Sequence, residues 1–178
     1  MKAISSFVFH RLMGWKMDGA FPDVDKCVVA VVPHTSWVDF PLGVLVRSVL
    51  GIQINYVGKK SLFRPPFGWF FRWMGGAPVD RGKRKDTVKA VAEIFHEREV
   101  FRLALAPEGT RKKVEQWKTG YYYIALEAGV PIVLVAFDYG TKTVRFSEPR
   151  MPTGDYASDY ASYRSFFKGV VGKVPRNT

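Results

Sequence analysis

The stretch AVVPHTSWVDFPLG, residues 30–43, contains the end of one regular element and the start of another. It closes an apolar run of β-branched and small residues, Val28–Val32, which is typical of a buried strand. Pro33 ends this run. Phe40–Leu50 then follows the pattern of a helix, with Pro41 tolerated in its first turn. A strand, a polar turn and a helix in this order predict the first unit of an α/β fold.

The same alternation continues along the chain. Strands are predicted at Ile54–Val57, Ala77–Val79, Phe101–Ala106 and Pro131–Phe137, and helices at Thr87–Arg98, at Thr119–Ala128 before Gly129, and around the helically spaced Tyr156, Tyr160, Tyr163, Phe167 and Val170. Strands that alternate with helices predict an α/β fold whose central sheet is mixed, largely parallel and covered by helices. With 178 residues and no linker, internal repeat or low-complexity tract, the chain is expected to form a single domain, residues 1–178.

The composition excludes a disordered chain and points to an anionic partner. Hydrophobic residues make up 47% and aromatic residues 15% of the chain, enough for a packed core. The chain has 27 Lys and Arg against 16 Asp and Glu, and the net charge of +11 favours phosphate, nucleic acid or an acidic membrane surface as a partner. The single cysteine, Cys27, begins an apolar run. We therefore expect a reducing compartment and a buried, inert thiol.

No segment is predicted to cross a membrane, because none has the ~18 consecutive apolar residues that a spanning helix needs. The apolar stretch near the N-terminus stops at His10 without a cleavage pattern, which argues against a secretory signal. Within residues 1–17, apolar residues keep the spacing of one helix face beside cationic residues. This pattern fits an amphipathic helix on a membrane surface, or one packed on the core. We expect a cytoplasmic protein, peripheral on the inner face of the membrane.

Polar residues suited to catalysis collect at three places, each directly after a predicted strand. They are His34–Asp39, Asp80 with Arg81, and PEGTRKK at residues 107–113. Functional groups in α/β sheets gather beyond the carboxyl ends of the strands. The shared placement therefore predicts that these three clusters meet in the folded protein.

His34 and Asp39 are a candidate catalytic pair. Because they are five residues apart, they would point away from each other on a continuous helix, so the pair requires a strand-to-helix turn. In such a turn the carboxylate holds the proton on one imidazole nitrogen and leaves the other as a base, worth roughly 10²- to 10⁴-fold in rate. The alternative is that Ser36 and Asp39 form a capping box and that His34 is only a polar loop residue.

The other two clusters supply cations and a tight turn. Arg81 offers a planar guanidinium that suits a phosphate, and a surface ion pair is the alternative role. The EGTR segment combines a carboxylate, a permissive backbone, a hydroxyl and a cation. Its residues are Glu108, Gly109, Thr110 and Arg111. A tight turn without a function would explain the same four residues.

Taken together, these residues resemble the glycerolipid acyltransferase superfamily, of which lysophosphatidate (1-acylglycerol-3-phosphate) acyltransferase is the best-known type. The family's motifs appear in order as His34 with Asp39, Gly76–Arg81, Glu108–Arg111 and the apolar block Val130–Val133, and a Lys-x-Gly after the third motif appears as Lys118 and Gly120. The chain departs from the family pattern at three positions. Pro33 stands where Asn is common, Lys112 where Ser is frequent, and Leu134 where a second Pro often occurs.

The resemblance implies a fold of the glycerolphosphate acyltransferase type and an O-acyltransferase activity that needs no cofactor or metal. Acyl-CoA or acyl carrier protein would donate a fatty acyl group to a hydroxyl of a lysophospholipid such as 1-acylglycerol-3-phosphate. His34 would take the proton of that hydroxyl, and Asp39 would orient His34. Acceptor binding is assigned by the resemblance to Arg81, Glu108, Gly109, Thr110, Arg111 and Lys118, whose cations would pair with a phosphate.

An aromatic-rich segment, Leu62–Met74, lies between the first two motifs. Its large apolar side chains fit core packing, or contact with an acyl chain or lipid. The cations in and beside it favour an anionic membrane surface. A nucleic-acid partner would explain the charge but would leave the His/Asp pair without a role. The chain has no Gly-x-Ser-x-Gly elbow, which disfavours a serine hydrolase, and acylation of a lipid without phosphate is the remaining enzymatic alternative.

Overall fold

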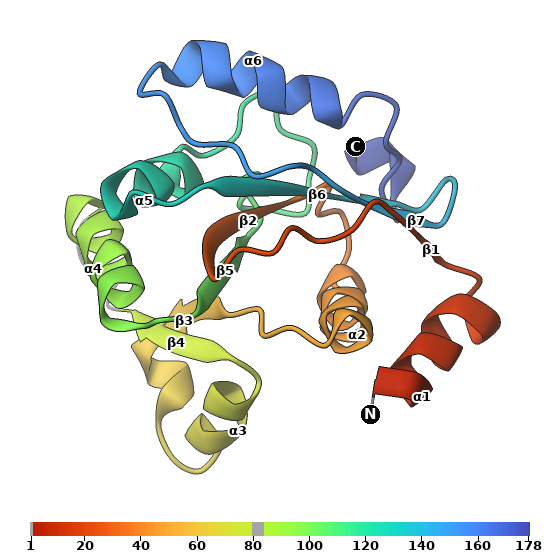
Figure 1. Ribbon diagram of the computed structural model, residues 1–178, viewed down its shortest axis with the longest axis horizontal. Coiled ribbons are helices and arrows are strands. Elements are labelled where there is room, and N and C mark those ends of the chain that lie inside the picture. Colours follow the sequence, from red (N-terminus) through yellow and green to blue (C-terminus); the bar gives the residue numbers. More distant parts are fainter. Residues whose placement is uncertain (1, 80–83) are drawn as a thin grey trace.

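A five-stranded sheet forms the centre of the protein in the computed structural model, which describes residues 2–79 and 84–178. The strand order is β1-β7-β6-β2-β5. The strands are β1 (Lys16–Asp18), β2 (Lys26–Val32), β5 (Phe101–Leu105), β6 (Ile132–Asp138) and β7 (Thr143–Phe146). β6 and β7 are antiparallel, and the other neighbouring strands are parallel. The predicted mixed, largely parallel sheet is therefore confirmed (Figure 1).

Helices cover both faces of this sheet (Figure 1). One face carries α4 (Arg84–Glu97), α5 (Gly120–Ala128) and α6 (Tyr156–Phe166), and the other carries α1 (Lys2–Phe7), the π-helical turn η1 (Val8–Leu12) and α2 (Asp39–Leu50). In β2, Val28 and Ala30 pack towards the first group of helices, whereas Cys27 and Val29 pack towards the second. Side chains alternate along a strand, so a strand covered on both faces requires the continuous apolar run that this sequence has.

A second sheet of two parallel strands lies beyond the β5 edge. It consists of β3 (Tyr56–Lys59) and β4 (Gly76–Val79), with the 3-10 turn η2 (Lys60–Phe63) and α3 (Gly68–Trp73) between them. Asn55 joins the two sheets, because its N–H donates to the Arg102 carbonyl at 2.7 Å and its carbonyl accepts from the Ala104 N–H at 2.8 Å. The sequence predicts both strands but not that they form a sheet of their own.

The N-terminal segment differs most from its prediction. The predicted amphipathic helix over residues 1–17 is wrong in extent, since the helical part ends at Leu12 and β1 follows. Phe9 and Trp15 are buried in the core. Other apolar residues of the same segment are exposed: Ile4, Phe7 and Leu12. The apolar positions of this segment are therefore divided between the core and the surface.

The remaining predicted helices and strands are present, with ends displaced by a few residues at most. α5 ends before Gly129, whose φ of 65° is left-handed, as its position after an apolar helix predicts. β1, β7 and α3 are not predicted, because charged residues interrupt their short runs of apolar residues. No helix in the described part of the chain is both long enough and apolar enough to span a membrane.

Candidate active site

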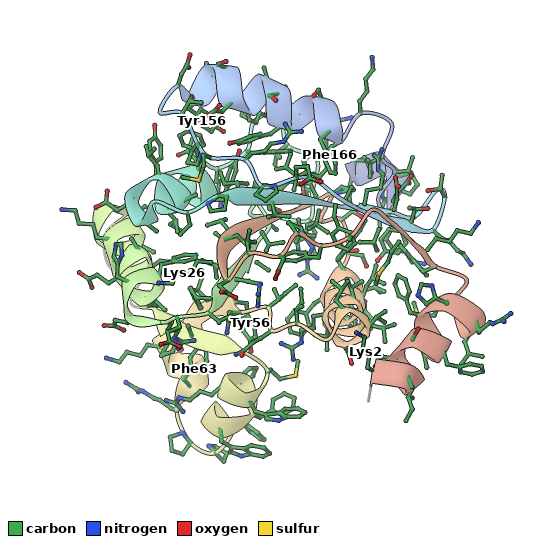
Figure 2. The ribbon with its side chains drawn as sticks, viewed as in Figure 1. Lys2, Lys26, Tyr56, Phe63, Tyr156 and Phe166 are labelled. Atoms are coloured by element: carbon green, nitrogen blue, oxygen red, sulfur yellow. The ribbon has the colours of Figure 1, made fainter. Side chains whose placement is uncertain are left out.

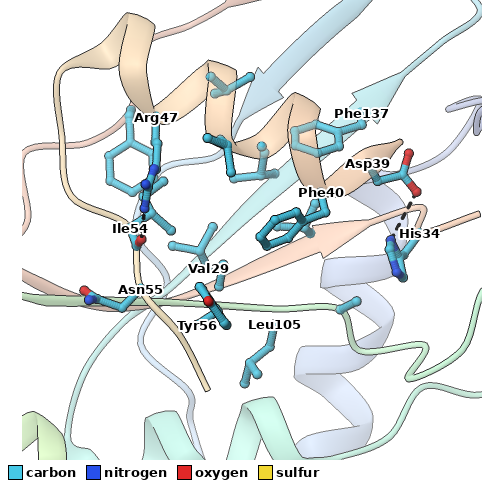
Figure 3. Close-up of a pocket in the computed structure, with 18 of the residues that line it drawn as sticks. Val29, His34, Asp39, Phe40, Arg47, Ile54, Asn55, Tyr56, Leu105 and Phe137 are labelled. Atoms are coloured by element: carbon cyan, nitrogen blue, oxygen red, sulfur yellow. Dashed lines mark hydrogen bonds and ion pairs between the residues drawn. The ribbon is translucent and has the colours of Figure 1, made fainter. Parts of the chain in front are cut away.

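The loop between β2 and α2 brings His34 and Asp39 together. β2 ends at Val32 and α2 begins at Asp39, so the two residues lie on either side of a strand-to-helix turn, as predicted. His34 Nδ1 is 3.1 Å from Asp39 Oδ2 (Figure 3). The side chain of His34 is 29% exposed, whereas that of Asp39 is 2% exposed. The carboxylate is thus sealed behind an imidazole that remains accessible.

Asp39 is held in its ionised form by the groups around it. Its Oδ2 also accepts the Thr35 and Ser36 N–H groups, each at 2.9 Å, and its Oδ1 accepts the Tyr139 hydroxyl at 2.8 Å. Burial alone would raise the pKa of Asp39. The hydrogen bonds from His34, the Ser36 N–H and Tyr139 outweigh burial and hold this pKa below its usual value. The position of Asp39 at the start of α2 adds a favourable interaction with the helix dipole.

The capping alternative for this loop is also partly realised. Ser36 donates its N–H to Asp39, and its Oγ accepts the Val38 N–H at 3.3 Å. The same carboxylate therefore closes the turn and pairs with His34. The two roles predicted as alternatives are compatible, because Asp39 Oδ2 receives backbone and imidazole donors together.

The second nitrogen of His34 is available for chemistry. Within residues 2–79 and 84–178, no hydrogen-bond partner of His34 Nε2 is found, and the ring lines a cavity. Pairing of Nδ1 with a carboxylate places the ring proton on Nδ1, so Nε2 carries the lone pair. An imidazole oriented in this way is equipped to act as a general base.

An apolar cavity of about 180 Å³ extends from His34 between α2 and the sheet. Figure 3 shows His34 and Asp39 at one end and Arg47, Ile54 and Asn55 at the other. Side chains from α2, β2 and β6 line the space between these ends, among them Phe40, Val44, Val46, Val29, Val31, Val135 and Phe137. At the far end, Arg47 donates to the carbonyls of Ile54 and Met74, at 3.1 and 2.7 Å. A long apolar group could thus lie in this cavity with its polar end at His34.

The loop after β5 meets the His34 loop, as the shared placement at strand ends predicted. Glu108 is buried, and its Oε2 accepts the backbone N–H of His34 at 2.5 Å. Burial raises the pKa of Glu108, although the His34 N–H opposes the shift. Glu108 therefore binds the backbone of the His34 loop, whereas Asp39 binds its imidazole.

Residues 109–113 of the third cluster lie at the surface. Gly109 has a left-handed φ of 63°, and a Cβ at this position would be 2.7 Å from the side chain of Lys118. Lys118 thus crosses the turn closely, and its N–H donates to the Pro107 carbonyl at 2.8 Å. Thr110 and Arg111 are exposed on the same turn. Arg81 lies outside the described residues, so the prediction that the second cluster joins the other two stays a prediction.

Two features of the site escaped prediction. Tyr139, which contacts Asp39, directly follows β6, so the rule about strand ends that selected the other clusters would also have found it. The cavity had no signal in the sequence, because its walls come from elements far apart in the chain.

The prediction of an inert thiol is confirmed, since Cys27 is fully buried and burial raises its pKa to about 12. Among the described residues, no group of His, Cys, Asp and Glu is arranged to hold a metal ion.

Known proteins resemble much of this chain. A family model described as Acyltransferase matches residues 20–138. A protein named 1-acyl-sn-glycerol-3-phosphate acyltransferase from Salmonella typhimurium is 38% identical over 86 residues, which cover 44% of this chain and 35% of that protein. The protein of the same name from Escherichia coli is 36% identical over 85 residues, with the same coverage of each chain.

A longer match is found to the protein of that name from Haemophilus influenzae, 28% identical over 136 residues, 71% of this chain and 55% of that protein. The chain therefore matches between about a third and just over half of the length of these relatives. No solved structure matches the chain significantly. Because the family model covers most of the chain, including the His34 and Glu108 loops, the protein belongs to the acyltransferase family, within the glycerolipid acyltransferase superfamily.

Proposed function

We propose that this protein transfers a fatty acyl group from an acyl thioester, carried by coenzyme A or acyl carrier protein, to a hydroxyl of a lysophospholipid such as 1-acylglycerol-3-phosphate. The observation that carries the proposal is the oriented His34–Asp39 pair, whose Nε2 lies at the end of an apolar cavity and has no partner among the described residues. The names of the relatives from Salmonella, Escherichia and Haemophilus support the same activity and the same acceptor.

In the proposed reaction His34 is a general base and then a general acid. As the acceptor oxygen forms a bond to the thioester carbonyl carbon, its proton passes to Nε2 of His34. Collapse of the tetrahedral intermediate breaks the C–S bond, and the imidazolium returns the proton to the departing sulfur. Asp39 stabilises the imidazolium through Nδ1. A covalent acyl-enzyme on Cys27 is disfavoured, because that thiol is buried and has a pKa of about 12.

The acyl chain of the donor is proposed to lie in the apolar cavity. A fatty acyl chain needs an apolar environment along its length, and this cavity has one, with His34 at the end where the thioester carbonyl would lie. The Arg47 guanidinium, held by two backbone carbonyls, closes the other end. In this arrangement the distance between His34 and Arg47 limits the length of the acyl chain.

The acceptor phosphate is proposed to bind the cations of the second and third motifs. Arg111 and Lys118 are exposed beside the turn at Gly109. Glu108, directly before this turn, contacts the His34 loop. Their position allows an anionic headgroup to lie near the catalytic base. Arg81 remains a proposed member of this set. Gly109 and Thr110 would shape the turn, whereas the contact of Glu108 with the His34 backbone favours a role in holding the loop.

The protein is proposed to act at an anionic membrane surface, on the cytoplasmic side. Phe67, Trp69 and Trp73 around α3 are 67%, 69% and 70% exposed, and Phe70 is 40% exposed. Figure 2 shows α3 at an edge of the molecule, with side chains that project away from the rest of the protein. The exposed Arg64 and Arg72 flank these rings. Exposed aromatic rings beside cations suit the headgroup region of an anionic bilayer. Phe63 of the same segment is buried, so core packing explains the position of this residue.

Release of free thiol tests the proposed reaction. The purified protein is incubated with an acyl donor, either acyl-CoA or acylated acyl carrier protein, and with lysolipids that do or do not carry a phosphate. We expect acceptor-dependent release that His34→Ala reduces by at least about 10²-fold. His96→Ala, which removes an exposed histidine from α4, is the matched control and should leave the rate unchanged. Equal rates in the His34→Ala variant and the wild type would refute the proposed base.

A further inference from the structure

We propose that Tyr139 is a positioning residue of the catalytic pair, which holds the Asp39 carboxylate so that one of its oxygens faces His34. The two carboxylate oxygens have separate partners. Oδ2 receives His34 Nδ1 together with backbone N–H groups of the loop, whereas Oδ1 receives the Tyr139 hydroxyl at 2.8 Å. A carboxylate bound at both oxygens cannot rotate about its Cβ–Cγ bond without losing a hydrogen bond. Its direction, and with it the direction of the imidazole, is then fixed.

The sheet explains why this tyrosine reaches Asp39. β2 and β6 are parallel neighbours, with Val32 opposite Ala136. β6 therefore continues past the end of β2, and the first residue after β6, Tyr139, lies beside the loop that follows β2. The two residues are 100 positions apart in the sequence, and only the pairing of these strands brings them together.

Tyr139 is itself held on several sides. Its N–H donates to the Val171 carbonyl at 2.8 Å, and its ring meets the edge of the buried Trp15 at a centroid distance of 4.9 Å. The same C-terminal segment also binds the catalytic loop, because the Val174 N–H donates to Thr35 Oγ1 at 3.1 Å. Tyr139 and the Asp39 loop are thus both hydrogen-bonded to the C-terminal segment, which lies beyond the matched family region. A residue that orients another residue must itself be held in place.

The hydroxyl of Tyr139 is a donor throughout the working pH range. Burial, reinforced by the neighbouring carboxylate, raises the pKa of Tyr139 far above its usual value. Among the described residues, the ionisable groups that face Asp39 are His34 in its own loop, Tyr139 after β6 and Glu108 after β5. The ammonium of Lys173 lies 5.6 Å from the centroid of the Tyr139 ring. Of these groups, His34 and Tyr139 both donate hydrogen bonds to the Asp39 carboxylate and favour its ionised form.

Tyr139→Phe tests this role, because it removes the hydroxyl and keeps the ring that packs on Trp15. We expect kcat for thiol release to fall by about tenfold with KM nearly unchanged, since a charge-assisted hydrogen bond that never touches substrate is lost. Tyr163→Phe is the matched control. It removes the hydroxyl of a buried tyrosine that lacks a hydrogen-bond partner among the described residues, and it should change none of these quantities.

A carbon-13 NMR titration of the Asp39 carboxyl supplies a readout that needs no turnover. The kinetic part of this inference rests on the proposed function, whereas the titration does not. An inactive wild type would therefore refute the proposed function, and the titration would still decide the role of Tyr139. We expect the pKa of Asp39 to rise in Tyr139→Phe and to stay unchanged in Tyr163→Phe. In the unmutated protein, the ring signals of Tyr139 should shift as Asp39 titrates. This measurement tests the contact even if the Tyr139→Phe variant does not fold. An unchanged Asp39 titration in Tyr139→Phe, or Tyr139 signals that ignore the ionisation of Asp39, would overturn the assignment.

Discussion

A larger side chain at position 43 should change which acyl chains the protein accepts. Gly43 lies in α2 and lines the cavity, and a Cβ placed there would be 3.8 Å from the ring of Phe137, an ordinary contact. A leucine at this position adds four carbon atoms to the cavity. Each methylene displaced from an apolar site loses ~0.8 kcal/mol, so a long acyl chain that withdraws by four methylenes loses roughly 3 kcal/mol, or about 10²-fold in kcat/KM.

Thiol release from a series of acyl-CoA donors, from acetyl to palmitoyl, measures this effect. Gly43→Leu should reduce kcat/KM for long donors by about 10²-fold and leave the shortest donors nearly unchanged. Gly43→Ala is the matched control. It removes space for one methylene, about a fourfold effect, while alanine stabilises a helix by ~0.5–1 kcal/mol relative to glycine. An equal loss for short and long donors in a folded Gly43→Leu variant would show that the donor chain does not lie in this cavity.

Three further outcomes follow from the geometry of the site and its surroundings. Glu108→Gln keeps an oxygen acceptor for the His34 N–H and removes a buried charge, so we expect kcat within about threefold of the wild type, whereas Glu108→Ala should lose about tenfold or more; loss of activity in the glutamine variant would mean that Glu108 acts through its charge. Asp39 has a lowered pKa when folded, so its ionisation stabilises the fold above the usual carboxyl range and this contribution is lost as the pH falls through the folded pKa. The gap in urea midpoint between the wild type and Asp39→Asn should therefore shrink between about pH 7 and about pH 3, and a constant gap would contradict the shift. Replacing Trp69 and Trp73 by Ser should weaken cosedimentation with anionic vesicles by about tenfold or more, while Met151→Ser, an exposed apolar residue between β7 and α6, should not.

The longest elements were predicted correctly because their pattern is local. β2 and β6 are strands of 7 residues that are apolar except for Lys26 and Asp138, and α2 and α4 keep a helical period over 12 and 14 residues. β7 gives the opposite case. Its TVRF segment alternates polar and apolar residues over only 4 positions, too few to predict a strand, and β6 offers it an antiparallel partner. The N-terminal segment was predicted too long as a helix, because spacing alone does not reveal that Trp15 belongs to the core.

For the site, the sequence was sufficient to select His34, Asp39 and the EGTR segment, because the chemistry of these residue types and their place after strands are local properties. It also determined that the pair requires a turn rather than a helix. Burial, however, depends on every element that packs around a group. For this reason, the sequence does not show whether the α3 aromatic rings are exposed or packed in the core. It also does not show that Asp39 both caps the turn and pairs with His34.

Only the tertiary structure decided which atoms face each other. The pairing of β2 with β6 brings Tyr139 to Asp39, and the loop after β5 brings Glu108 to the His34 backbone. The packing of α2 on the sheet leaves a cavity that ends at His34. Residue types and short spacings are local properties of the sequence. Contacts across 74 or 100 positions arise only when loop-closure entropy is offset by burial of the whole core, so no local pattern encodes them.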